Sequence, residues 1–138
     1  MFRDFDPTEY EEEARDRWGD TDAYRESARR TASYTDADWE AIRREADAVV
    51  GEFADAMADG EPAEGDRART TAERHRHHIT RWFYPVSTPM HRNLAELYLA
   101  DHRFAERYDR TAPGLAAYVH DAIVANADAI ERSGGLST

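Results

Sequence analysis

Hydrophobic and polar positions follow the period of an α-helix over most of the chain. The clearest case begins after Thr35, where the acidic residues at 36 and 38 are typical of a helix start, and it ends near Gly60. With residues spaced about 100° apart, one side of this segment carries its apolar residues, which are Trp39, Ile42, Ala46, Val49, Val50, Phe53 and Met57. The pattern predicts an amphipathic helix that packs against a core.

Four more helical segments are predicted after this one. They cover about 66–83, a stretch that starts at 88, a short turn at about 103–108, and a last segment from 115 to near 134. Prolines interrupt the pattern before residue 90, because proline lacks the N–H that a helix interior needs. No alternating strand pattern occurs, so the sequence predicts an all-α domain of six to seven short helices.

The N-terminal part of the chain is poor in aliphatic side chains. Capping signals predict one helix that ends near Trp18 and a second from about 20 to 33, yet no Leu, Ile or Val precedes Ile42. Folding must offset the lost conformational entropy of the backbone, mainly by burying apolar surface. We therefore expect the helices within 8–35 to form a lid that needs a further surface, such as a ligand.

Composition and charge narrow the function. At 138 residues the chain is predicted to form a single domain over 1–138, with its helical core at 36–134. The net charge of −11, with arginine as its 18 cations, argues against nucleic-acid binding by this chain, because phosphate neutralisation needs clustered cations. No stretch approaches the roughly 18 apolar residues of a membrane span, so we expect no membrane contact and a cytoplasmic location.

The sequence contains no recognisable catalytic motif. The chain has no cysteine, which excludes a thiolate metal site and a thiol nucleophile. We find no acid–base pair, no Gly-rich phosphate loop and no Ser-His-Asp order. The sequence therefore predicts neither an enzyme nor a bound cofactor.

Three histidines lie close together in one predicted helix. Helical spacing puts His75 and His78 on the apolar side of this helix and His77 on the opposite side. Two histidines three residues apart could hold a metal or a haem if His91 or the pair at 101–102 supplied a further ligand. We favour interior histidines that form hydrogen bonds in a core or a cleft, and we predict no metal.

Polar groups also lie on other predicted apolar faces. Asn126 falls near the middle of the apolar face of the last helix, where an unpaired buried amide would cost about 1–3 kcal/mol. It either bonds to a neighbouring backbone group in the core or anchors a ligand in a cleft. His91 and Tyr98 lie at the edge of an apolar face, and we expect them to line a groove rather than fill the core.

Several segments, in this order and spacing, resemble one family of ligand-binding domains. They include Arg17-Trp18-Gly19-Asp20-Thr21-Asp22-Ala23-Tyr24, Met90-His91 and the stretches at 30–35, 94–98, 101–104, 113–118 and 121–127. Between Tyr10 and Ala127 the chain is similar to the TipAS family, an antibiotic-recognition domain that is often fused behind a MerR-type DNA-binding module.

This resemblance implies a globin-like helical domain that binds large, heterocycle-rich peptide antibiotics of the thiopeptide kind in a cleft. It also implies N-terminal helices that become ordered when the ligand arrives. Aromatic rings, histidines and amides suit such a ligand. The ligand-binding residues that we expect are Trp18, Tyr24, Tyr34, His75, His78, Trp82, Val86, Met90, His91, Tyr98 and Asn126.

One departure from the family pattern changes the expected chemistry. Members that capture thiopeptides covalently carry a cysteine where this chain has Val86, and a serine hydroxyl without an activating base does not replace it. We therefore expect reversible binding. Two other functions stay open, namely a protein–protein interaction module of a transcriptional regulator and a histidine-based metal or haem binder. The chain is expected to be either a stand-alone sequestering protein or part of a longer regulator.

Overall fold

The computed structural model describes residues 22–133, which form an all-helical fold. Its elements are α2 (Asp22–Thr31), α3 (Asp36–Ala58), α4 (Asp66–Trp82), α5 (Thr88–Ala100), α6 (His102–Thr111) and α7 (Leu115–Arg132). The predicted all-α class is confirmed. The helix predicted to end near Trp18 lies outside the described residues.

One helix is longer than the sequence pattern predicts. The segment at 103–108, expected to be a short turn, belongs to the ten-residue helix α6. Asp101 starts this helix, because its side chain accepts a hydrogen bond from the backbone N–H of Arg103. Tyr108 near its end is buried against Tyr98 of α5. Tertiary packing thus stabilises a helix whose local signal is weak.

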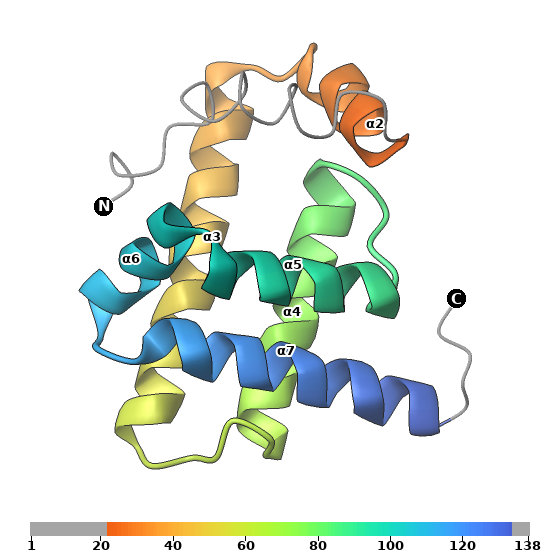
Figure 1. Ribbon diagram of the computed structural model, residues 1–138. Coiled ribbons are helices and arrows are strands. Elements are labelled where there is room, and N and C mark those ends of the chain that lie inside the picture. Colours follow the sequence, from red (N-terminus) through yellow and green to blue (C-terminus); the bar gives the residue numbers. More distant parts are fainter. Residues whose placement is uncertain (1–21, 134–138) are drawn as a thin grey trace.

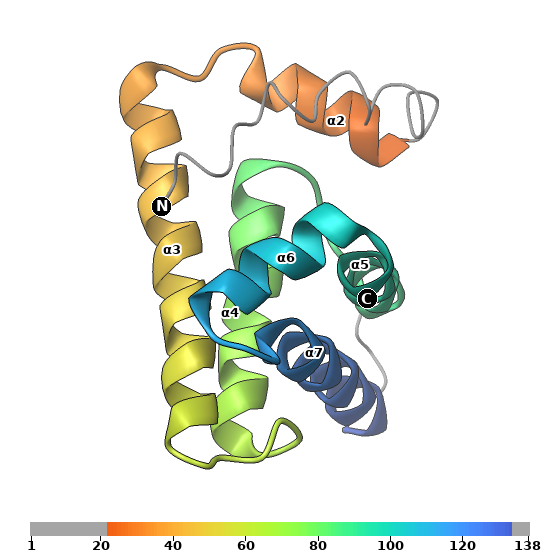
Figure 2. The ribbon, with the colours of Figure 1, turned by 60° about the vertical axis from the view of Figure 1, so that its left-hand side comes forward.

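Two pairs of helices build the fold (Figures 1 and 2). α3 and α4 lie side by side, while α5 and α7 lie side by side and cross them. α6 leads from α5 to α7, and α2 lies across the ends of α3 and α4 that are remote from their connecting loop. Because α7 contacts α3, α4, α5 and α6, it is the central element of the described structure.

Local side-chain signals set where several helices begin. The Thr35 hydroxyl accepts from the backbone N–H of Asp38, whose carboxylate accepts from the N–H of Thr35, and this capping box starts α3. Ser87 caps α5 by accepting from the N–H of Met90. Gly114 precedes α7 with a φ of 86°, which glycine adopts without a steric penalty.

The core lies where α7 meets the other helices. Its buried apolar residues include Phe53, Ala68, Ala72, Ala95, Leu115, Val119, Ala122 and Ile123. Alanine at four of these positions lets the helix backbones approach one another closely. Residues at 42, 49 and 53 of α3 are buried, as the periodicity of that segment predicts.

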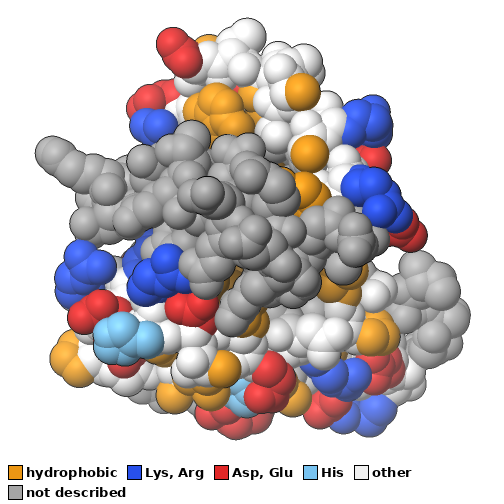
Figure 3. Space-filling view, turned by 45° about the horizontal axis from the view of Figure 1, so that its top comes forward, with side chains coloured by type: hydrophobic (Ala, Val, Ile, Leu, Met, Phe, Trp, Pro, Cys, Tyr) orange, Lys and Arg blue, Asp and Glu red, His pale blue; other side chains and the backbone are white. Residues whose placement is uncertain are grey.

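Ion pairs join the outer surfaces of the helices. Arg92 on α5 pairs with Asp128 and Glu131 on α7, and the Thr88 hydroxyl donates to Glu131. On the face shown in Figure 3, acidic and basic side chains of the described residues lie next to one another rather than in separate patches. Within residues 22–133, no helix is long and apolar enough to cross a membrane.

Candidate functional site

Most of the predicted ligand-binding residues lie in three places in the structure. These are the core beneath α5, the C-terminal end of α4, and a groove along the outer side of α4. Tyr24 on α2 and Met90 at the start of α5 are half-buried. Trp18 lies outside the described residues.

In the core, His75 and His91 form a hydrogen-bonded pair. Nδ1 of His75 lies 2.8 Å from Nε2 of His91, and the two ring planes are 19° apart. Burial lowers the pKa of His75 well below its usual value and that of His91 to about 3, so both rings are neutral near pH 7. The Tyr98 hydroxyl lies 3.3 Å from the other nitrogen of His75. His75 is thus a hydrogen-bonded interior histidine, as we expect from the sequence.

The structure contradicts the expectation that His91 and Tyr98 line a groove. The His91 side chain is fully buried, and Tyr98 is 9% exposed. The reason is α6, because Phe104 and Tyr108 place their ring centroids 5.3 and 5.6 Å from that of Tyr98 and close the core over it. Within the described residues, no group of three histidine or carboxylate side chains is placed to hold a metal.

The segment between α4 and α5 is also packed inward. The Val86 side chain is buried, its N–H donates to the Thr80 hydroxyl, and its carbonyl accepts from the Arg76 guanidinium at 2.7 Å. The backbone N–H and carbonyl of Val86 therefore both bind this segment to α4.

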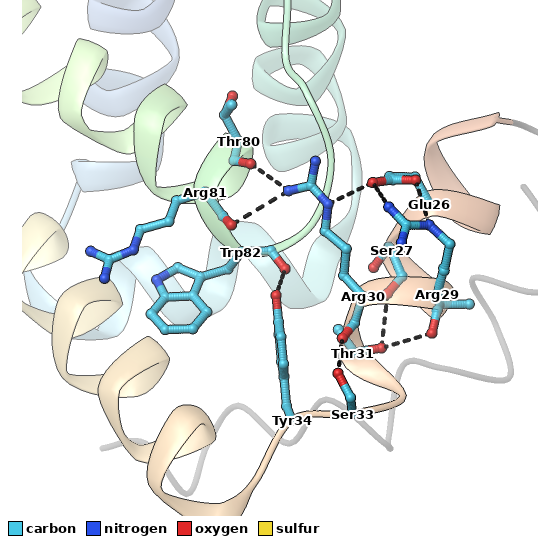
Figure 4. Close-up of polar contacts among 11 residues, drawn as sticks. Glu26, Ser27, Arg29, Arg30, Thr31, Ser33, Tyr34, Thr80, Arg81 and Trp82 are labelled. Carbon is cyan, nitrogen blue, oxygen red and sulfur yellow. Dashed lines mark hydrogen bonds and ion pairs between the residues drawn. The ribbon is translucent and has the colours of Figure 1, made fainter.

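The C-terminal end of α4 carries an aromatic cluster and anchors α2 (Figure 4). Tyr34 and Trp82 meet edge to face with ring centroids 5.6 Å apart, and the Tyr34 hydroxyl donates to the Trp82 carbonyl. Arg30 of α2 donates to the Thr80 carbonyl at 2.7 Å. These contacts satisfy carbonyls that the last turn of a helix leaves free. Two residues expected in a ligand site thus lie together here.

Glu45 on α3 connects this cluster to the groove. Its carboxylate accepts from the Trp82 indole N–H at 2.8 Å and lies 3.1 Å from Nδ1 of His78. Partial burial raises the pKa of Glu45, but the N–H groups of Trp82 and His78 lower it further, so the net pKa is below its usual range. The carboxylate is therefore an ionised acceptor that fixes one indole and one imidazole.

An open groove of about 900 Å³ runs along α4 between α3 and α7. His78 and Asn126 are the predicted residues that line it. Sequence reasoning did not select Glu45 or Glu73, which also line the groove. The spacing of Glu73 four residues before His77 could have drawn attention to it, because residues at i and i+4 are neighbours on a helix.

Asn126 bonds to a side chain rather than to a neighbouring backbone group. Its Nδ2 donates to Oε1 of Glu73 at 2.8 Å, and the residue is 6% exposed. Of the two roles that the sequence left open for Asn126, a hydrogen bond to a neighbouring backbone group is therefore wrong about the partner. Its position beside the groove leaves the ligand-anchor interpretation as a prediction.

Comparisons with known proteins give this geometry a context. The model of the TipAS antibiotic-recognition domain matches residues 10–126. The chain is 51% identical over 127 residues to the HTH-type transcriptional activator TipA of Streptomyces coelicolor and to that of Streptomyces lividans. These alignments cover 92% of this chain and 50% of each relative, so the chain spans about half the length of the curated relatives it matches.

Two solved structures are similar as well. One is TipAS in complex with nosiheptide, from a thiopeptide antibiotic multidrug resistance system of Streptomyces lividans, with a TM-score of 0.86 and 50% identity over 94% of this chain and 90% of that chain. The other is the antibiotic binding domain of a TipA-class multidrug resistance transcriptional regulator, with a TM-score of 0.60 and 44% identity over 64% of this chain and 95% of that chain.

Proposed function

Because this chain belongs to the TipAS family of antibiotic-recognition domains, we propose that it binds a thiopeptide, or a similar large heterocyclic peptide, reversibly. The observation that carries the proposal is the groove of about 900 Å³ along α4, which two of the sequence-predicted residues line. Its size lies within the range of about 300–1,000 Å³ that is typical of small-molecule sites.

The groove and the aromatic cluster beyond Glu45 together offer chemistry that suits such a ligand. Aromatic rings at the end of α4 provide flat apolar area for azole and pyridine rings. Asn126 and the imidazole of His78 provide polar atoms that can align peptide groups. His75, His91 and Tyr98 lie beneath this surface, and in our proposal they hold α4 against α5 rather than contact the ligand.

We propose that no covalent bond forms and that no reaction is catalysed. The chain contains no cysteine. The buried Val86 stands where the family members that capture thiopeptides covalently are expected to carry one. In the same proposal, residues 8–35 act as a lid whose packing the ligand completes. Where the chain is joined to a DNA-binding module, as the name of its TipA relatives indicates for them, binding would serve transcriptional control in the cytoplasm.

Calorimetric titration with nosiheptide tests the proposal. We expect saturable binding with one ligand per chain, a fully reversible complex, and an unchanged protein mass after denaturation. Glu45→Gln should weaken binding, because the carboxylate fixes both Trp82 and His78. Glu106→Gln is the matched control, since Glu106 is exposed on α6 and does not line the groove.

Three results would refute this proposal. They are the absence of nosiheptide binding, a protein mass increased by the ligand, and equal weakening by the two glutamine variants. The first would also favour the alternative of a protein–protein interaction module, which needs no small molecule.

A further inference from the structure

The amide of Asn126 is held in one orientation. Its partner Glu73 is a carboxylate, and an ionised carboxylate accepts hydrogen bonds but donates none. The NH₂ group of Asn126 must therefore face Glu73, at 2.8 Å between Nδ2 and Oε1. The carbonyl oxygen Oδ1 then points away from Glu73. This assignment of the amide N and O atoms follows from the hydrogen-bonding capacity of the carboxylate.

Glu73 is itself fixed from two sides. Arg76 donates to both of its oxygens, at 3.0 Å from Nε and 2.5 Å from a terminal nitrogen, and His77 places Nε2 2.8 Å from Oε2. Burial raises the pKa of Glu73, but the bonds from Arg76 and Asn126 lower it further. The carboxylate therefore stays ionised near pH 7 and cannot rotate without breaking several bonds.

The Oδ1 atom of Asn126 is left without a partner in the described part of the chain. The only hydrogen bond from this side chain to residues 22–133 is the one to Glu73. The residue is 6% exposed and lines the groove, so only a small part of it is open to solvent, and that part is within reach of a ligand in the groove. An acceptor in such a place gains more from a ligand N–H than an exposed one, because little solvation is lost in exchange.

We propose that Glu73 is a positioning residue that presents Oδ1 of Asn126 to the groove, where it accepts a hydrogen bond from a peptide N–H of the ligand. This inference rests on the proposed function and names the ligand group that Asn126 selects. The group is a secondary amide N–H, because azole and pyridine rings without an N–H cannot donate. Glu73 acts through Asn126 and does not itself touch the ligand.

A double-mutant cycle with nosiheptide as the probe tests the proposal. Asn126→Ala should raise the dissociation constant about fivefold to tenfold, the loss of one net hydrogen bond. Glu73→Gln should weaken binding about threefold to tenfold, because a glutamine amide can present either atom to Asn126 and no longer fixes it. In the Asn126→Ala background, Glu73→Gln should have no further effect. Glu52→Gln is the control, since Glu52 pairs with Arg74 and not with Asn126.

A spectroscopic measurement on the unmodified protein keeps the proposal testable if a variant does not fold. The side-chain NH₂ signals of Asn126 should shift when nosiheptide saturates the protein, because accepting a bond at Oδ1 polarises the amide. Three results would overturn the inference. They are NH₂ signals of Asn126 that do not shift on binding, an unchanged affinity in Glu73→Gln, and a Glu73→Gln effect that persists in the Asn126→Ala background. If the wild-type protein does not bind nosiheptide, the proposed function fails as well. If the wild-type protein binds nosiheptide but the affinity does not depend on Glu73 or Asn126, only the positioning role of Glu73 is refuted and the proposed function stands.

Discussion

Acidification should destabilise this protein through its buried histidine pair. Burial lowers the pKa of His91 from the usual 6.5 to about 3 and moves the pKa of His75 in the same direction. Unfolded chains bind a proton at these side chains near pH 6.5, whereas the folded protein does not. The unfolded state therefore binds more protons below pH 6.5, and stability falls as the pH falls from 6.5 towards 3.

The size of the effect follows from the same linkage. A histidine that is protonated only in the unfolded state lowers the unfolding free energy by about 1.4 kcal/mol for each pH unit below 6.5. His91 therefore lowers it by about 1.4 kcal/mol at pH 5.5 relative to neutral pH. His75 adds a loss in the same direction. The lowered pKa values of Glu45 and Glu73 also reduce stability in acid, but only as the pH falls below about 4.5. A comparison of pH 7.5 with pH 5.5 thus isolates the histidines.

One histidine acts in the opposite direction. Partial burial lowers the pKa of His120, but Glu96 and Asp121, each 2.9 Å from a ring nitrogen, raise it further, so the net pKa is above 6.5. Its contribution to stability is complete below pH 6.5 and is lost as the pH rises through its folded pKa. Measurements in a His120→Gln background remove this opposing contribution.

Urea unfolding followed by circular dichroism at pH 7.5, 6.5 and 5.5 measures the effect. In His91→Gln the loss between pH 7.5 and 5.5 should shrink by about 1.4 kcal/mol, the contribution of one titrating group. His77→Gln, which changes an exposed histidine outside the buried pair, is the control variant. The reasoning is refuted if the unfolding free energy of the His120→Gln protein is the same at pH 7.5 and 5.5, or if adding His91→Gln leaves its pH dependence unchanged.

Two further predictions concern packing and the attachment of α2. Ile123→Ala should lower the unfolding free energy by about 2–5 kcal/mol, because Ile123 is fully buried in α7, whereas Leu99→Ala at a 40% exposed position should change it by about 0.5 kcal/mol or less; equal losses in urea unfolding would contradict this. Tyr34→Phe should speed amide exchange in α2 with little change in global stability, because it removes the bond to the Trp82 carbonyl. Tyr118→Phe, which removes a bond to the Glu61 carbonyl instead, should leave α2 exchange unchanged, and an α2 that exchanges equally in both variants would disprove the assignment.

Local signals in the sequence were sufficient for the starts of α3, α5 and α7 and for the buried sides of α3 and α7. The capping box at Thr35, the proline break before α5 and the glycine before α7 lie within a few residues of the boundaries they set. The spacing of Val119 and Ile123 likewise marked the buried side of α7. These features depend on neighbours within one or two helical turns, so a sequence pattern contains them.

The position of the polar groups was decided only by tertiary structure. Tyr98 lies in the core because Phe104 and Tyr108 of α6, a helix with a weak local signal, pack over it. His91 is buried beside His75 of α4, which lies 16 positions earlier in the chain. Asn126 meets Glu73, which lies 53 positions earlier in the chain. Periodicity tells which side of a helix faces inward, but not which face of another helix it meets. Whether a polar residue fills the core or borders the groove depends on that pairing, which is fixed only when α3, α4 and α7 pack together.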